Sequence, residues 1–142
     1  MTTPGRTIDY DFVAHALREL FGQHNILKVA YDPWHFDFFK PSLLRAGFTE
    51  SVIAERFQEF AQTTKMMSPA MANLERLLLD GRMVHGVLSM CVANTTIRMD
   101  AAGNRAPDKR KSTHRIDGTV ALIMALAMVP QVKPFDVEAL IG

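Results

Sequence analysis

Residues 120–129, Val-Ala-Leu-Ile-Met-Ala-Leu-Ala-Met-Val, decide the fold class of this chain. They carry no polar side chain and lie in a helix that we predict over residues 113–129. A membrane-spanning helix needs about 20 apolar residues, so this run is too short to cross a bilayer. A helix without a polar face must instead be covered on all sides by a sheet and neighbouring helices. The run therefore indicates an α/β protein.

Upstream of this helix, the apolar periodicity and the turn residues predict alternating helices and strands. The predicted helices span residues 8–22, 34–46, 68–79 and 87–94, and the predicted strands span residues 26–31, 50–57 and 95–99. Gly81 suits the left-handed position that follows the end of the helix over residues 68–79. Residues 100–112 collect Gly, Asn, Pro and charges without apolar anchors, which predicts an exposed and mobile loop. Three strands are few for a sheet covered on two faces, so we expect strands to be missing from the N-terminal side.

The composition is that of one globular domain over residues 1–142. Of the 142 side chains 48% are apolar and 22% are charged, which excludes a disordered or collagen-like chain. Cys91 is the only cysteine, so an intramolecular disulfide is excluded. Together with the absence of a secretory leader at the start of the sequence, this favours a reducing cytosol. The net charge of +1 argues neither for nor against a nucleic-acid partner.

Two aspartates stand where an α/β fold gathers its chemistry. Asp32 follows the predicted strand over residues 26–31, and ligands of open sheets bind beyond the carboxyl ends of strands; Asp32 with Pro33 is equally a simple turn. Asp117 lies in the first turn of the last helix, where the helix dipole alone also favours a carboxylate. Residues 109–111, Lys-Arg-Lys, are either a phosphate-binding loop or a solvated one. Carboxylates beside a positive loop suit a phosphodiester site that holds Mg²⁺ or Mn²⁺.

Other cofactor motifs are missing from the sequence. The five histidines show no zinc-ligand spacing, and neither the phosphate-binding loop of ATPases nor the glycine-rich dinucleotide fingerprint is present. The sequence therefore predicts neither a zinc site nor ATP or dinucleotide binding.

Two segments are specific when they occur in this order and at this separation. They are residues 30–34, Ala-Tyr-Asp-Pro-Trp, and residues 112–122, Ser-Thr-His-Arg-Ile-Asp-Gly-Thr-Val-Ala-Leu. Further matching segments are Thr3-Pro4-Gly5, Leu74-Glu75, His85-Gly86, Asp100 with Gly103-Asn104, and Pro107-Asp108-Lys109. Together these segments cover essentially the whole chain and resemble the C-terminal nuclease domain of the large subunit of tailed-phage terminases.

The resemblance implies an RNase H-like mixed sheet flanked by helices, with acidic residues that hold two divalent metals, Mg²⁺ or Mn²⁺. Asp32 matches the second catalytic and metal-binding acid of the family, and Asp117 matches the third. Residues 109–111 and Arg115 are expected to bind DNA phosphates. His114 stands where family members often carry an acid, so we leave it out of the metal site. The first acid of the family has no match, so we expect a sheet incomplete at its N-terminal side and a chain that by itself cuts DNA weakly or not at all.

The resemblance also implies the partners and the setting. The substrate would be concatemeric double-stranded viral DNA, and the intact protein would add the packaging ATPase domain, the small terminase subunit and the portal. The setting would be the cytoplasm of a bacterial host, without a membrane partner. An uncovered edge of the strand over residues 26–31 predicts a homo-oligomer. The alternative hypothesis is a non-catalytic module, a prophage remnant or inactive fragment, that contacts DNA or docks on the portal.

Overall fold

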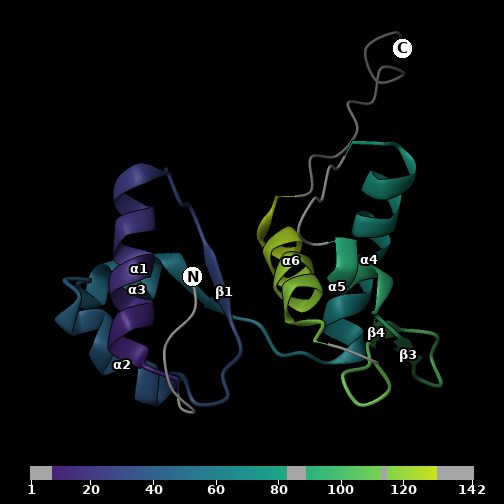
Figure 1. The fold of residues 1–142 in the computed structure, drawn as a ribbon, viewed down its shortest axis with the longest axis horizontal. Helices are drawn as coiled ribbons and strands as arrows, with labels where there is room; N and C mark the ends of the chain where they lie inside the picture. Colours follow the sequence, from purple (N-terminus) through teal and green to yellow (C-terminus); the bar gives the residue numbers. More distant parts are fainter. Residues whose placement is uncertain (1–7, 83–88, 113–114, 131–142) are drawn as a thin grey trace, which may run out of the picture.

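Helices and strands gather in two halves that follow each other along the chain (Figure 1). The computed structural model describes residues 8–82, 89–112 and 115–130. The N-terminal half holds α1 (Tyr10–Gln23), β1 (Val29–Tyr31), α2 (Phe36–Arg45), α3 (Glu50–Arg56) and β2 (Phe57–Glu59). The C-terminal half holds α4 (Thr64–Leu79), α5 (Ser89–Ala93), β3 (Ile97–Met99), β4 (Arg105–Pro107) and α6 (Asp117–Met128). Mixed helices and strands confirm the α/β class.

The strands of the described residues form two separate sheets of two strands each, where a single mixed sheet was expected. β1 and β2 are parallel, with Val29 opposite Phe57, and α2 and α3 make the crossover that parallel strands require. β3 and β4 form an antiparallel hairpin. Each strand is only three residues long, so each pairing is short.

The predicted strand over residues 50–57 is wrong, because most of it forms helix α3. The Thr49 side chain accepts a hydrogen bond from the backbone N–H of Val52, which caps the first turn of the helix. Ile53 is buried on the inner face, while Glu50 and Ala54 are exposed. This one-sided burial is helical, and the strand begins only where the predicted one ended.

The long predicted helix is confirmed, but it begins four residues earlier than expected. Thr63 caps α4 by accepting a hydrogen bond from the N–H of Met66, so that Pro69 lies inside the helix. Proline is common in the first turn of a helix, whereas Pro69 lies in the second turn of α4. Gly81 follows the end of α4 with φ +64°, the left-handed conformation predicted for it.

The predicted loop over residues 100–112 is wrong in its middle, where β4 pairs with β3. The apolar anchor is Ala106, which is fully buried against α4 and α6, and Pro107 beside it is buried as well. Asp100 shapes the turn of the hairpin, since its carboxylate accepts hydrogen bonds from the backbone N–H groups of Ala102 and Asn104. The loop was predicted because large apolar side chains are missing from this segment. In the structure, small buried residues and a turn held by a carboxylate order it instead.

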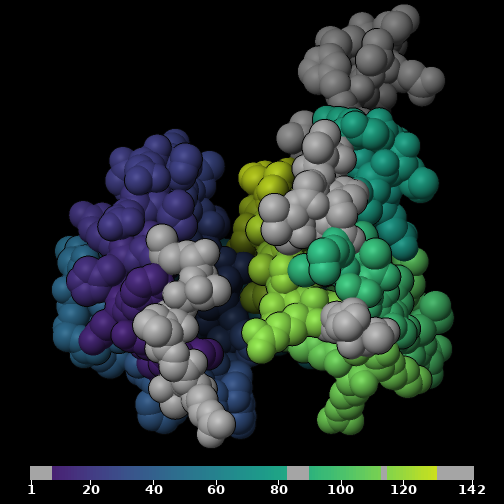
Figure 2. All heavy atoms as spheres, viewed as in Figure 1, coloured from purple at the N-terminus to yellow at the C-terminus, as the bar shows by residue number. Residues whose placement is uncertain are grey.

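Helix α6 contacts α4, α5 and β1, and its atoms lie at the boundary between the two halves (Figure 2). It begins at Asp117, so the predicted start at residue 113 is wrong: Arg115 and Ile116 are not helical, and residues 113–114 lie outside the described residues. The prediction that this helix is covered on all sides is wrong, because Ala121 and Ala125 are exposed. Alanine presents little apolar surface, so an uncovered stripe of alanines costs little.

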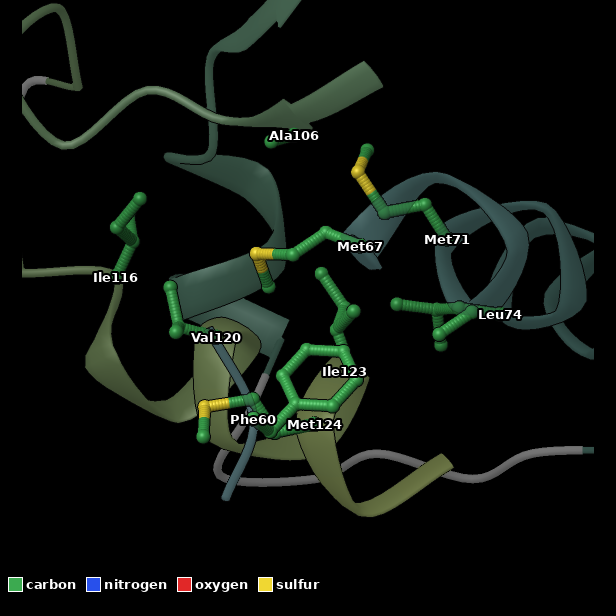
Figure 3. Close-up of a cluster of buried hydrophobic side chains, with 10 residues drawn as sticks. Phe60, Met67, Met71, Leu74, Ala106, Ile116, Val120, Ile123 and Met124 are labelled. Carbon is green, nitrogen blue, oxygen red and sulfur yellow. The ribbon is translucent and has the colours of Figure 1, made fainter. Parts of the chain in front are cut away.

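The buried side chains fall into two clusters, one in each half. The first cluster joins α1, α2, α3 and β2 through Ala14, Leu43, Phe48, Ile53 and Phe57. The second cluster joins α4, β4 and α6, and Figure 3 shows its side chains meeting between the two helices. Ala30 of β1 packs against the second cluster, so β1 contributes to the contact between the halves. No helix within the described residues is long and apolar enough to span a membrane.

Candidate functional site

Asp32 follows β1 directly, as the sequence predicted. Its Oδ1 accepts a hydrogen bond of 3.0 Å from the backbone N–H of Trp34, which makes a short turn closed by the aspartate side chain. The next residue, His35, has φ +65° and is the only described residue other than glycine in the left-handed region. The turn therefore fixes the carboxylate of Asp32 at the end of the strand, and within the described residues its second oxygen has no hydrogen-bond donor.

An open hollow of about 380 Å³ surrounds this turn. Its lining is mainly aromatic and apolar, comprising Ile8, Tyr10, Val13, Tyr31, Asp32, Trp34, His35, Phe36 and Phe39. Tyr31 and Phe36 stack with ring centroids 3.7 Å apart, while Trp34 is 77% exposed. Among the described residues of this lining, Asp32 is the only acid.

Asp117 is the first residue of α6, which confirms its predicted place in the first turn. The preceding residue, Ile116, offers no side-chain cap, and the helix dipole favours a negative charge at this end. Lys109 Nζ lies 3.2 Å from Asp117 Oδ1, with the two side chains 50% and 74% exposed. The structure thus brings the basic loop, defined as residues 109–111, to the candidate metal ligand on α6.

The basic loop also lines a second hollow of about 540 Å³, which we call the basic hollow. Its lining comprises Gln62, Met67, Arg98, Pro107, Asp108, Lys109, Arg110, Lys111 and Val120. Arg98, on β3, is a functional candidate that the sequence analysis missed. No local sequence pattern marks Arg98; its place follows from the pairing of β3 with β4, which sets Arg98 opposite Ala106 and close to the basic loop. Arg115 is exposed two residues before α6 and does not line the hollow.

Asp32 follows β1 and Asp117 begins α6, and these two elements contact each other. No hydrogen bond or ion pair of the described residues joins the two aspartates. Asp32 lines the hollow around its own turn and does not line the basic hollow. Within the described ranges no three His, Cys, Asp or Glu residues are grouped as a metal site. Carboxylate oxygens are nevertheless the donors that Mg²⁺ takes, and it is commonly held by one or two carboxylates plus waters and substrate phosphates. The donor chemistry of the two aspartates fits such an ion.

Two other acids of the C-terminal half are engaged in holding the fold. Asp100 accepts hydrogen bonds from Thr64 Oγ1 at 2.8 Å and from Asn104 Nδ2 at 3.0 Å, and these bonds hold the pKa of its carboxyl below the ordinary value. Glu75 on α4 binds both terminal nitrogens of Arg105 on β4, each at 2.8 Å. These bonds tie the hairpin to α4, so the acids serve the placement of Arg98 and the basic loop.

Comparison with known proteins places the chain in a family. The model of the family described as terminase large subunit, endonuclease domain, matches residues 3–131. The chain belongs to this family. The large terminase subunit of Enterobacteria phage HK97 is 41% identical over 128 residues, which are 88% of this chain and 24% of that protein.

Solved structures agree with this assignment. The crystal structure of the HK97 bacteriophage large terminase matches 91% of this terminase chain and 26% of its own, with a TM-score of 0.80 and 40% identity. The large terminase nuclease from thermophilic phage G20c matches with a TM-score of 0.61 over 87% of this chain and 64% of its own, at 15% identity, which shows a shared fold. The chain spans about a quarter of the length of the HK97 protein.

Proposed function

We propose that residues 1–142 form the C-terminal part of an RNase H-like nuclease domain, which cuts concatemeric double-stranded DNA during packaging in a metal-dependent reaction. Membership of the endonuclease-domain family supports a nuclease. The observation that carries the proposal is the placement of Asp117 at the start of α6, bound to a lysine of the basic loop, on a helix that contacts β1 and thus the strand before Asp32.

Asp32 and Asp117 are the residues that would hold Mg²⁺ or Mn²⁺. When bound, such ions stabilise charge on the attacking and leaving oxygens of a phosphodiester. The protein's own contribution is to orient and to bind. The turn at Trp34 fixes the Asp32 carboxylate, while Arg115 and the basic loop attract the DNA backbone.

In the intact terminase we expect further partners, since this chain covers about a quarter of the HK97 protein. The packaging ATPase domain, the small terminase subunit and the portal are the partners proposed, in the cytoplasm of a bacterial host. In the described residues β1 pairs with β2 alone, so its second edge is open to another strand. A second copy of the chain at that edge would appear as a dimer mass in light scattering, and a monomer mass at high concentration would reject it.

The metal site is tested by titrating the chain with Mn²⁺ and following the free ion by electron paramagnetic resonance. Asp32→Asn and Asp117→Asn should each weaken Mn²⁺ binding at least roughly tenfold, because each removes one of few charged ligands. Asp37→Asn is the matched control, as Asp37 is an exposed acid in the first turn of α2. Cleavage of supercoiled plasmid with Mn²⁺ is measured on the same proteins.

Two results would contradict the metal-site proposal. Wild-type Mn²⁺ affinity in both variants would remove the two aspartates from the site. A loss of thermal stability in Asp117→Asn without a loss of Mn²⁺ binding would assign Asp117 to the helix dipole alone.

The second candidate function is a DNA-contacting module without catalysis. It is favoured by the basic hollow, which gathers four cations, whereas the described residues group no three metal-ligating side chains. DNA binding in EDTA combined with no Mn²⁺ binding and no plasmid cleavage would establish this function over the first.

A further inference from the structure

We propose that Arg98 and the basic loop bind one stretch of the DNA backbone in the basic hollow, with Arg98 as its fixed guanidinium contact. The inference rests on the proposed function only in taking DNA as the ligand. It adds a binding residue and a location, and neither depends on a bound metal.

The hairpin fixes the position of Arg98. Arg98 pairs with Ala106, which is fully buried, so the backbone under the guanidinium is anchored in the core. The ladder continues through the N–H of Asp108, which donates to the carbonyl of Thr96 at 2.7 Å. This pairing leads the chain from β4 straight into the basic loop and keeps the loop beside Arg98.

Within the described residues, the guanidinium of Arg98 uses only part of its N–H groups as hydrogen-bond donors. Its Nη2 donates to the carbonyl of Gln62 at 3.3 Å, and no described carboxylate forms an ion pair with it. By contrast, Arg45, Arg76 and Arg105 each bind a carboxylate. An arginine carries five N–H groups in a planar fork that matches a phosphate. An exposed guanidinium that forms no ion pair with a described carboxylate is therefore suited to bind an anion.

The basic loop is held in place by its own acid. Asp108 Oδ1 accepts hydrogen bonds from the backbone N–H groups of Arg110 at 3.0 Å and Lys111 at 3.4 Å. Ser112 Oγ donates to the Asp108 carbonyl at 2.7 Å and accepts from the N–H of Thr96 at 3.1 Å. The carboxylate of Asp108 therefore shapes the loop, and four cations against one acid among the described lining residues make this lining positively charged.

The size and the walls of the hollow favour a length of backbone over a single ion. A volume of about 540 Å³ lies in the range of sites for small organic ligands and far exceeds one phosphate group. Met67 and Val120 line the hollow from the core of Figure 3, where they are almost completely buried, so a bound backbone would meet mainly the side chains of Arg98 and the basic loop. Lys109 lines the same hollow and binds Asp117, so the bound backbone would pass beside the candidate metal ligand.

The test is fluorescence anisotropy of a short labelled duplex in EDTA, with the full chain and its Arg98→Gln variant. Removing one phosphate contact should weaken binding roughly tenfold and reduce the salt slope by about 0.9 between about 50 and 200 mM salt. Two duplexes of unrelated sequence should lose affinity equally, because phosphates carry no base sequence. Arg98 is exposed, so circular dichroism should show an unchanged fold.

Arg76→Gln is the matched control. Arg76 is exposed on α4, outside the basic hollow, and lies roughly 18 Å along the helix from its first residue, Thr64. It should leave affinity and salt slope at wild-type values. Equal losses in the two variants would reduce the effect to general charge and overturn the assignment of Arg98, as would a loss confined to one sequence.

Inorganic phosphate is the second probe. If the hollow binds DNA backbone, phosphate should displace the duplex no better than chloride at the same ionic strength. Displacement by low concentrations of phosphate would make the hollow a free-phosphate site and overturn the proposal, as would absence of duplex binding by the wild type. Because all these measurements are made in EDTA, failure of the metal site in the Mn²⁺ titration leaves them unaffected, and the two proposals fail separately.

Discussion

The two halves of the molecule have cores of different chemistry. In the N-terminal half, aromatic rings fix one another, since Phe57 lies edge-on to Phe48 at 5.6 Å and stacks on Phe21 at 6.1 Å between centroids. In the C-terminal half, three methionines, Met67, Met71 and Met124, fill the space between α4 and α6 (Figure 3). Aromatic pairs prefer specific geometries, whereas methionine is flexible and fills irregular gaps.

This difference is relevant to the candidate site because each half supplies one aspartate. Asp32 follows a strand that belongs to the aromatic half, and its carboxylate is fixed by a backbone N–H. Asp117, Arg98 and the basic loop belong to the methionine half, and Met67 itself lines the basic hollow. The candidate ligand Asp32 therefore lies next to a core of aromatic pairs with specific geometries, and the candidate DNA contacts lie next to a core of flexible methionines.

The largest expected effect comes from the aromatic half. Phe57→Ala should lower the free energy of unfolding by about 3–5 kcal/mol, because it removes a buried ring with several aromatic neighbours. Met67→Leu, which conserves volume in the methionine half, should cost less than about 1.5 kcal/mol. Urea denaturation followed by circular dichroism measures both. Phe57→Leu should cost more than Met67→Leu, because it removes the aromatic contacts; equal losses in these two variants would show that both cores tolerate a change of side-chain shape equally and would contradict the comparison.

A second prediction uses pH to weaken the methionine half. Thr64 and then Asn104 hold the pKa of Asp100 below its ordinary value of 3.8, so the charged form is favoured by folding. A lowered pKa contributes stability that is fully present above the ordinary value and is lost as the pH falls through the lower value of the folded state. The wild type should therefore lose its advantage over Asp100→Asn as the pH is lowered below about 4.

Thermal melts of both proteins from neutral to acid pH measure this advantage. It should be largest near neutral pH and narrow at acid pH. A difference in melting temperature that stays constant across the range would mean that Asp100 stabilises the hairpin by shape and not by charge.

The apolar periodicity along each segment predicted the helices of the fold well. Single capping and turn residues explain where the predictions were wrong. The helices α1, α2 and α4 follow from apolar spacing, and Gly81 adopts the conformation expected of it. The strand predicted at residue 50 failed because the Thr49 cap outweighs the β-forming Val52 and Ile53. β4 was missed because its anchor, Ala106, carries almost no hydrophobic signal, although the fold buries it completely.

The candidate site divides in the same way. The strand end before Asp32 and the place of Asp117 in a first helical turn were predicted from local sequence, although α6 begins four residues later than expected. Arg98 was not, because its place beside the basic loop depends on the pairing of β3 with a strand that the sequence did not reveal. Register across a hairpin is a tertiary property, and a missed partner strand hides every neighbour that it brings.

The smallest effect on stability is expected from two surface ion pairs, one in each half. Lys109 binds Asp117 at 3.2 Å and Lys40 binds Glu50 at 2.8 Å; three of the four side chains are at least half exposed, and that of Lys40 is 38% exposed. Exposed pairs contribute little, so Lys109→Met should change the free energy of unfolding by less than about 0.5 kcal/mol, and Lys40→Met should also cause only a small change. The two variants should differ in duplex binding, because only Lys109 lines the basic hollow.

Lys109→Met should reduce the salt slope of duplex binding by about 0.9, while Lys40→Met should leave it unchanged. Urea denaturation and fluorescence anisotropy on the same protein preparations measure the two properties together. If Lys109→Met destabilised the fold strongly and bound DNA like the wild type, the lysine would be a structural tie between the hairpin and α6. The methionine half would then depend on its surface charges for stability, and its contrast with the aromatic half would lie in polar bonding instead of core chemistry.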